Sequence, residues 1–251
     1  KKIISIHSFR SLIPYIKNFH FLSDFDNVIV GCQQSKDLLN SYNIRCSVFP
    51  YYIDNSEIES HSYKPGEYII GVGFVQYRKG VDRFIQIAKM MPHKKFIWVG
   101  SLADCQINES YLHFEYMNFL SSDYKIGQPI KKLTSNIEIP PNVEFVGLKS
   151  EKESKEYILN SKCLLMLSTD DTFPLVVIVA KTFNKPVVNI KESGGSWTIC
   201  DEGDLIIERF EPNKIIDYLN KLEIREYSLN KELIDRLKSN IHINRSVYLD
   251  N

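Results

Sequence analysis

Short runs of consecutive apolar residues alternate with amphipathic segments along most of this 251-residue chain. The main runs, in chain order, cover residues 68–72, 96–99, 143–146, 163–167, 186–190 and 205–207. Runs that are apolar throughout, rather than at every second position, are typical of strands buried on both faces of a parallel sheet. Because helical patterns lie between them, the sequence predicts an α/β fold with a doubly wound parallel, Rossmann-like sheet.

Helical periodicity fills the intervals between these strands. After Gly80, apolar residues recur at helical spacing until Pro92 ends the pattern. Residues 151–160 predict a charged helix with Tyr157 and Ile158 on its inner face. Further helices are predicted from about Pro174 to Phe183 and over 215–222. We therefore expect helices on both faces of the sheet.

The first third of the chain predicts a second unit. Strand signals at 3–6 and 28–30 precede a polar stretch, 55–66, that reads as a linker. We expect residues 1–54 to be a remnant of an incomplete N-terminal Rossmann-like domain, and 55–251 to form the main domain. Residues 101–140 break the alternation and are interpreted as a helix-bearing surface excursion. The chain opens without Met, which favours a trimmed or partial protein.

Composition narrows the class of protein. Lys plus Arg and Asp plus Glu both number 31, so no excess positive charge favours nucleic-acid binding. The five cysteines are scattered without metal-ligand spacing, which favours reduced thiols and no metal site. No apolar stretch approaches the ~20 residues that span a bilayer, and no signal peptide is evident. A cytoplasmic location is expected, with the cytoplasmic face of a membrane as the alternative.

A lysine follows the first strand of the main domain. The strand of residues 68–72 stops at Gly73, and Lys79-Gly80 opens a helix after a short loop. A lysine beside exposed amides at strand ends suits a phosphate group. The alternative interpretation is a solvated lysine at a helix start.

A second polar segment follows the buried strand 163–167. Asp170 and Asp171 come directly after it, and Pro174 sits where a helix would begin, at the first helical position. The free amides of Leu175 and Val176 would then face a diphosphate. The alternative is that one aspartate merely caps the helix.

These segments, in this order, resemble the C-terminal domain of the retaining GT-B glycosyltransferases, the family that includes sucrose and glycogen synthases. The resemblance spans about residues 26–222. Its counterparts here are Gly73, Lys79-Gly80, Val99-Gly100, Asn142 to Gly147, Ser168, Asp171, Phe173, Leu175, Ala180, Lys185 to Val188 and Gly194-Gly195.

The resemblance implies a donor-binding domain whose substrate is a nucleotide diphosphate-sugar, with no other cofactor. It implies catalytic roles for His7, Lys79 and Asp171, His7 being the histidine that a strand delivers to the donor sugar. A structural histidine at a strand end is the alternative for His7. The implied donor-binding residues are Gly73, Phe74, Lys79, Gly147, Asp171, Phe173, Leu175, Val176 and Val179.

Three of these positions depart from the family pattern. Phe74 falls where the family has a phosphate-binding arginine, and Asp171 is shorter than the usual glutamate. Val179 replaces the second glutamate, which holds the ribose hydroxyls, and valine cannot accept a hydrogen bond. Losing a charged hydrogen bond costs ~1.5–3 kcal/mol, roughly tenfold to a hundredfold in affinity. Either another group holds the ribose, or donor binding is weak or lost.

Three functions follow. The first is transfer of a sugar, with retention of configuration, to an acceptor hydroxyl on a glycan, lipid or protein. The second is a degenerate, non-catalytic binding or scaffolding subunit. The third is an enzyme whose N-terminal domain is missing here or lies on a partner chain. The sequence identifies neither the sugar, the base nor the acceptor.

Overall fold

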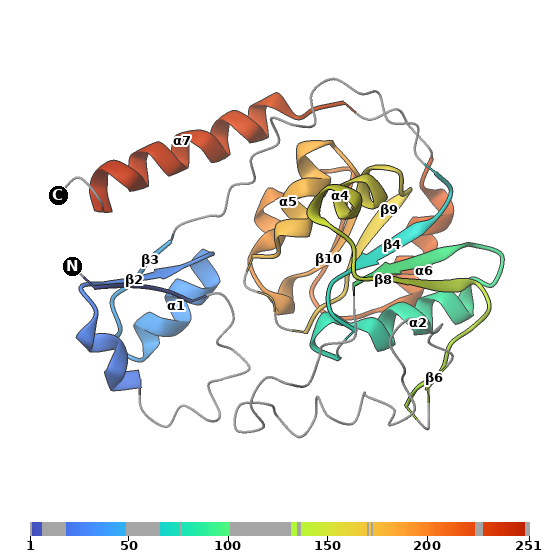
Figure 1. Cartoon of the computed structure of the whole chain (residues 1–251), viewed down its shortest axis with the longest axis horizontal. Helices are drawn as coiled ribbons and strands as arrows, with labels where there is room; N and C mark the ends of the chain where they lie inside the picture. The colour runs from blue at the N-terminus through green and yellow to red at the C-terminus, as the bar shows by residue number, and fades with distance from the viewer. Residues whose placement is uncertain are drawn as a thin grey trace.

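A computed structural model shows two separate parallel sheets and a small antiparallel pair (Figure 1). It describes residues 2–6, 19–48, 66–75, 77–100, 132–134, 137–169, 171, 173–223 and 228–248.

The larger sheet confirms the predicted doubly wound fold. Its six strands are β4 (Ile69–Val72), β5 (Phe96–Val99), β8 (Val143–Gly147), β9 (Cys163–Met166), β10 (Val187–Ile190) and β11 (Leu205–Ile207). All are parallel, in the spatial order β11-β10-β9-β4-β5-β8. The strand order therefore reverses between β4 and β9. In open α/β sheets, ligands bind beyond the carboxyl ends of the strands at such a reversal.

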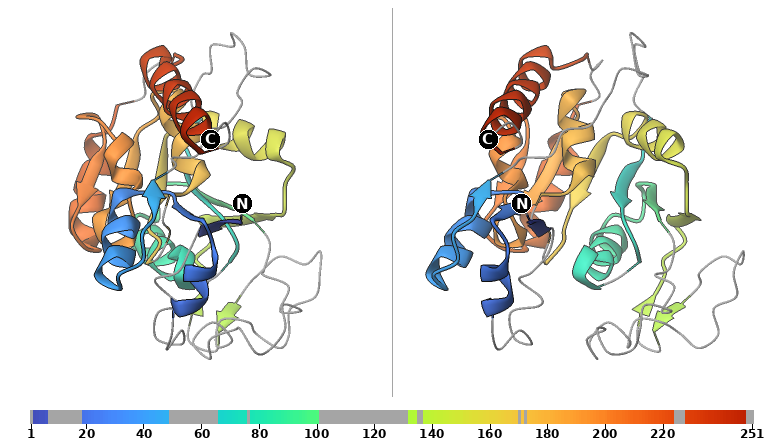
Figure 2. Two further views of the ribbon diagram at one scale, coloured as in Figure 1. Left: turned by 90° about the vertical axis from the view of Figure 1, so that its left-hand side faces the viewer. Right: turned by 60° about the vertical axis from the view of Figure 1, so that its left-hand side comes forward.

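Helices cover both faces of this sheet (Figures 1 and 2). One face packs against α2 (Val81–Met90) and α6 (Pro212–Lys221), and the other against α4 (Glu151–Leu159) and α5 (Leu175–Thr182). Neighbouring residues of β4 show the division, because Ile69 belongs to the first apolar cluster and Ile70 to the second. The helices predicted after Gly80 and over 151–160, 174–183 and 215–222 are thus present, with boundaries shifted by at most three residues.

The start of α5 corrects one prediction. Pro174 was expected as the first helical residue, but its φ of −66° and ψ of 126° place it before the helix as the N-cap. Its carbonyl accepts a 3.1 Å hydrogen bond from the Val177 amide. The helix therefore begins at Leu175, and the Leu175 and Val176 amides are its first two.

The smaller sheet contains β1 (Ile3–Ile6), β2 (Asn27–Val30) and β3 (Ser47–Val48), all parallel. A 3₁₀ helix, η1 (Phe19–Asp24), and α1 (Gln33–Ser41) accompany it. Its own apolar cluster is centred on Leu22, Val30 and Leu39. The two predicted strands are present, and α1 and β3 extend the unit beyond them.

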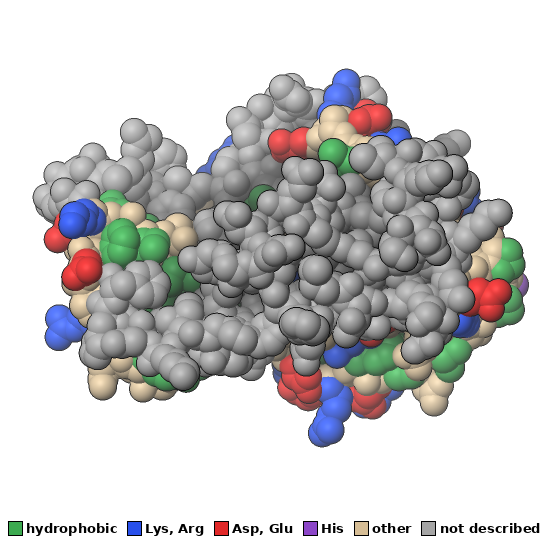
Figure 3. Space-filling view, turned by 60° about the horizontal axis from the view of Figure 1, so that its bottom comes forward, with side chains coloured by type: hydrophobic (Ala, Val, Ile, Leu, Met, Phe, Trp, Pro, Cys, Tyr) green, Lys and Arg blue, Asp and Glu red, His purple; other side chains and the backbone are tan. Residues whose placement is uncertain are grey.

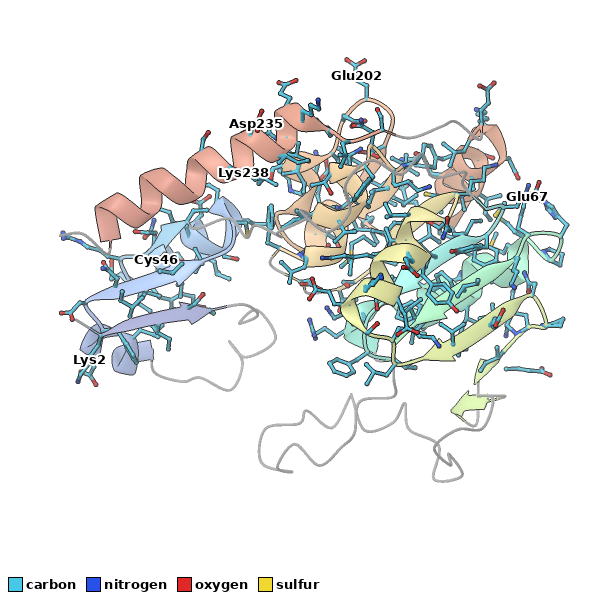
Figure 4. All side chains as sticks on the ribbon, turned by 45° about the horizontal axis from the view of Figure 1, so that its top comes forward. Lys2, Cys46, Glu67, Glu202, Asp235 and Lys238 are labelled. Carbon is cyan, nitrogen blue, oxygen red and sulfur yellow. The ribbon has the colours of Figure 1, made fainter. Side chains whose placement is uncertain are left out.

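The long helix α7 (Lys231–Tyr248) was not predicted. It begins beside the end of α5, where the Asn230 amide donates to the Thr182 carbonyl at 2.8 Å. Leu233 and Leu237 are buried against the α5 side of the sheet. From there α7 runs toward the smaller sheet, with Asp235 and Lys238 along its length (Figures 1 and 4).

Most of the 101–140 excursion lies outside the described residues, including the helix predicted there. Its described part forms β6 (Lys132–Thr134) and β7 (Ile137–Glu138), an antiparallel pair. Among the helices that the structure describes, none is sufficiently long and apolar to span a bilayer.

Candidate functional site

The loops after β4 and β9 meet at the carboxyl edge of the larger sheet, where the strand order reverses. A 3₁₀ turn, η3 (Tyr77–Lys79), follows β4 and delivers Lys79 to this edge. Gly80 comes next with a φ of +75°, and a Cβ there would lie 2.2 Å from the Leu167 carbonyl oxygen. Only glycine fits this close approach. The loop that carries Lys79 is therefore packed directly against the end of β9.

Lys79 and Asp171 form an ion pair between Nζ and Oδ2 at this edge. Their side chains are only 18% and 11% exposed. The lysine stem passes over Gly73, since a Cβ on Gly73 would lie 3.3 Å from Lys79 Cδ. Lys79 is thus not the solvated lysine of the alternative interpretation. Contact with a phosphate stays a prediction.

Backbone hydrogen bonds hold the surrounding loops together. The Thr169 amide donates to the Arg78 carbonyl at 2.8 Å, which joins the loops after β9 and β4. The Asp171 amide donates to the Ser193 carbonyl at 2.7 Å, which joins the loop after β10, near Gly194-Gly195. Sequence reasoning missed these contacts because carbonyl acceptors leave no residue-specific signal.

Three glycines line the ends of β4, β5 and β8. Gly73, Gly100 and Gly147 have positive φ values of 141°, 141° and 76°. A Cβ on Gly100 would lie 2.0 Å from the Gly73 oxygen, so packing explains that glycine. A Cβ on Gly147 would meet nothing within 4 Å. The surface at Gly147 is therefore open backbone that a ligand can approach closely.

Apolar side chains surround this edge. Phe74 is 50% exposed and Leu175 is 49% exposed, whereas Val176 is half-buried and Phe173 is buried. Phe74 thus stands at the edge without the charge of an arginine. The amides of Leu175 and Val176, as the first of α5, have no partner within the helix. They lie close in sequence to Asp171, at the positive end of the helix.

Val179 is buried, whereas the resemblance implies a donor-binding residue at this position. Its side chain is 4% exposed and belongs to the apolar cluster between α5 and the sheet. All residues from Val177 to Thr182 are buried. The structure therefore packs Val179 among apolar side chains, and contact with a ribose stays a prediction.

The remaining predicted residues fall outside the site as described. His7 and Asp170 lie outside the described residues. Across the described ranges, no group of three His, Cys, Asp or Glu side chains could hold a metal ion.

On the face shown in Figure 3, described basic and acidic side chains are interspersed with hydrophobic ones.

A cavity of about 460 Å³ lies at the opposite, amino edge of the sheet. Lys181 is one of its lining residues and pairs with Asp201 and Asp204, at 2.7 Å each. The Lys181 ammonium is thus paired within the fold by two carboxylates. None of the described residues that line the cavity belongs to the carboxyl edge.

Comparison with known proteins identifies the family. The family described as "Glycosyl transferases group 1" matches residues 53–240. The α-galactosylglucosyldiacylglycerol synthase of Streptococcus pneumoniae is 26% identical over 121 residues, 48% of this chain and 27% of that protein. The processive diacylglycerol α-glucosyltransferase of Acholeplasma laidlawii is 23% identical over 189 residues, 69% of this chain and 50% of that protein. The chain thus spans half or less of these relatives.

A solved structure shows the same fold. S. aureus TarM, as a variant in complex with fondaparinux, α-GlcNAc-glycerol and UDP, superposes with a TM-score of 0.62 at 17% identity. The match covers 99% of this chain and 48% of the TarM chain.

Proposed function

Because this chain belongs to the group 1 glycosyl transferases, we propose that it binds a nucleotide diphosphate-sugar and transfers the sugar to an acceptor hydroxyl with retention of configuration. The observation that carries the proposal is the Lys79–Asp171 pair at the reversal of the strand order. There a cation, a carboxylate and the positive end of α5 converge, which suits a sugar diphosphate.

The described groups would act mainly by positioning and by charge. As the bond between sugar and diphosphate breaks, negative charge develops on the leaving diphosphate. The Lys79 ammonium and the first amides of α5 would stabilise it. The acceptor oxygen would form its bond to the anomeric carbon on the face from which the diphosphate leaves, and the leaving diphosphate would take the acceptor proton. Retention by this route needs neither a protein nucleophile nor a protein base. Orientation of donor and acceptor supplies the rest of the rate enhancement.

The acceptor we propose is a lipid alcohol presented at the face of a membrane. Both curated relatives are named for products or substrates built on diacylglycerol. A partner domain, on the same or another chain, would bind this acceptor, because the smaller sheet described here has only three strands.

A second function, a non-catalytic binding subunit, is favoured by one specific observation. The position at which the family places its ribose-binding carboxylate is filled by the buried Val179. Titration with UDP, GDP and ADP separates the two functions. Micromolar binding of one of them supports the enzyme, whereas no binding at millimolar concentration supports the subunit.

Replacing Lys79 should weaken diphosphate binding selectively. We expect Lys79→Ala to lower the affinity for the bound nucleoside diphosphate by about tenfold to a hundredfold, the usual value of a charged hydrogen bond. The matching nucleoside lacks phosphate, so its affinity should not change. Isothermal titration calorimetry measures both, and Lys95→Ala, at the amino edge of β5, is the matched control. Equal loss for nucleotide and nucleoside would place Lys79 away from the diphosphate.

Gly147→Ala tests whether the donor approaches the bare backbone at the end of β8. The added methyl group meets no protein atom within 4 Å. The positive φ should therefore limit the loss of stability to about 1–2 kcal/mol. If the donor lies on this backbone, the methyl group should reduce nucleotide affinity by about tenfold or more. Unchanged nucleotide affinity would mean that the donor does not reach Gly147.

A further inference from the structure

We propose that Asp171 is a positioning residue that holds the Lys79 ammonium while the site lacks a donor, and that the donor's diphosphate then takes this ammonium over. The exchange releases the Asp171 carboxylate, which can accept hydrogen bonds from hydroxyls of the donor sugar. This inference rests on the function proposed above. Lys79 would pair with Asp171 in the free protein and with the diphosphate in the donor complex, rather than with Asp171 in both.

The two partners are anchored differently. The backbone of Asp171 is held by its 2.7 Å hydrogen bond to the Ser193 carbonyl. Lys79 reaches the carboxylate with a long stem that lies over Gly73, where the missing Cβ leaves it room. A lysine ammonium is a point charge on four rotatable carbons, so it can change partner without moving the backbone. Lys79 is therefore the mobile partner, and Asp171 is the fixed one.

Because the Lys79–Asp171 pair is poorly exposed to solvent, only a ligand that offers a new partner to each of the two groups should separate it. Both side chains are less than one-fifth exposed. Separating two poorly hydrated charges is unfavourable unless each gains a new partner. An anion alone satisfies Lys79 but strands Asp171, and a neutral sugar alone does the reverse. A sugar diphosphate carries both an anion and hydroxyl donors, so it can satisfy both groups at once.

The start of α5 adds a second contact for the anion. Leu175 is only four residues beyond Asp171, and its amide and that of Val176 are the first of the helix. Amides at this end attract negative charge. A phosphate that takes Lys79 from Asp171 can therefore also bind these amides.

Exchange and a permanent pair predict opposite results for Asp171→Asn, which keeps the side-chain shape. If the pair persists in the bound state, Asp171 orients Lys79 for the phosphate, and Asp171→Asn should weaken diphosphate binding as Lys79→Met does. If the Lys79 ammonium instead passes from Asp171 to the diphosphate, Asp171→Asn removes the carboxylate that competes with the diphosphate for Lys79. The diphosphate should then bind as tightly as to the wild-type protein, or more tightly.

The experiment is calorimetric titration of the wild-type chain, Lys79→Met and Asp171→Asn with UDP, GDP, ADP, the parent nucleosides and UDP-glucose. We expect Lys79→Met to weaken diphosphate binding by about tenfold to a hundredfold, and Asp171→Asn to leave it equal or tighter. Asp171→Asn should also reduce the extra affinity that the sugar contributes. Thermal unfolding of each variant checks that it is folded, and the double variant, which has no stranded charge, provides a second folded comparison.

The possible failures are distinguishable. Binding of a diphosphate to the wild-type chain with equal weakening in both variants would overturn the exchange and leave the proposed function standing. No effect of Lys79→Met would overturn the exchange as well, because Lys79 would not contact the phosphate. Absence of any nucleoside diphosphate binding to the wild-type chain would overturn the proposed function and the exchange together.

Discussion

Val179→Glu is expected to destabilise the larger domain strongly rather than to restore a ribose contact. The side chain is 4% exposed and packs in the cluster that joins α5 to the sheet. A glutamate there would bury a carboxylate among apolar side chains, which typically lowers the free energy of unfolding by several kcal/mol. We expect a loss of about 3–5 kcal/mol, measured by urea unfolding followed by circular dichroism.

A matched control lies on the same helix. Leu175→Glu introduces the same carboxylate at a position that is 49% exposed and in the first turn of α5. Negative charge is favourable there, so its stability should change by less than about 1 kcal/mol. If Val179→Glu instead tightened nucleotide binding and melted like the wild-type chain, Val179 would face the ribose after all.

The pattern that predicted the sheet also contained the information that places Val179. Residues 175–180 are apolar without interruption, and a helix segment that is hydrophobic on every side is normally buried. Burial begins at Val177 here, because Leu175 in the first turn is 49% exposed. The family pattern pointed instead to a glutamate position at the site surface. In the structure Val179 is buried, as expected for a residue within a wholly apolar stretch of helix.

The strands were predicted well because burial on both faces leaves a simple signal. The run Cys163 to Leu167 became β9 with all four strand residues buried. Helix α7 carries a weaker signal, since only Leu233 and Leu237, one turn apart, mark its buried side within the described residues. Its described buried side packs against α5, a contact between distant segments that the sequence pattern does not show.

The chemistry of the site was predictable in part. Lys79 and Asp171 were identified individually from their places after two strands, and parallel strands bring their carboxyl ends to one edge. Their mutual ion pair was not identified, because 92 residues separate them and their approach depends on backbone. The close approach of Gly80 to the Leu167 carbonyl, which brings the two loops together, has no signature in the sequence and is seen only in the structure.

Lys185 should make the stability of the chain rise with pH above neutrality. Its side chain is fully buried before β10, and Nζ donates a hydrogen bond to the Ser161 carbonyl. Burial lowers the pKa of Lys185 from 10.5 to about 7, with a smaller opposing effect from Cys163. Burial disfavours the charge of Lys181 as well. There, however, the two aspartate partners outweigh burial and raise the pKa of Lys181.

The direction of the pH effect follows from the two states of Lys185. Below pH 7 the lysine is protonated in both states, so the folded protein carries the full penalty of a buried charge. Between pH 7 and 10.5 the unfolded chain keeps the proton that the folded chain has lost. Because the unfolded state then binds more protons, the free energy of unfolding rises with pH, by up to about 1.4 kcal/mol per unit.

Two variants isolate this contribution. Lys185→Met has no charge to bury, so its free energy of unfolding relative to the wild-type chain should fall steadily from pH 7 to pH 10. Lys185→Arg keeps its charge throughout this range, so its free energy of unfolding relative to the wild-type chain should also fall as the pH rises from 7 to 10. Urea unfolding at intervals of half a pH unit measures all three proteins. A difference between the wild-type chain and Lys185→Met that stays constant with pH would mean that Lys185 remains charged inside the fold, with its ammonium fully satisfied by buried carbonyl oxygens.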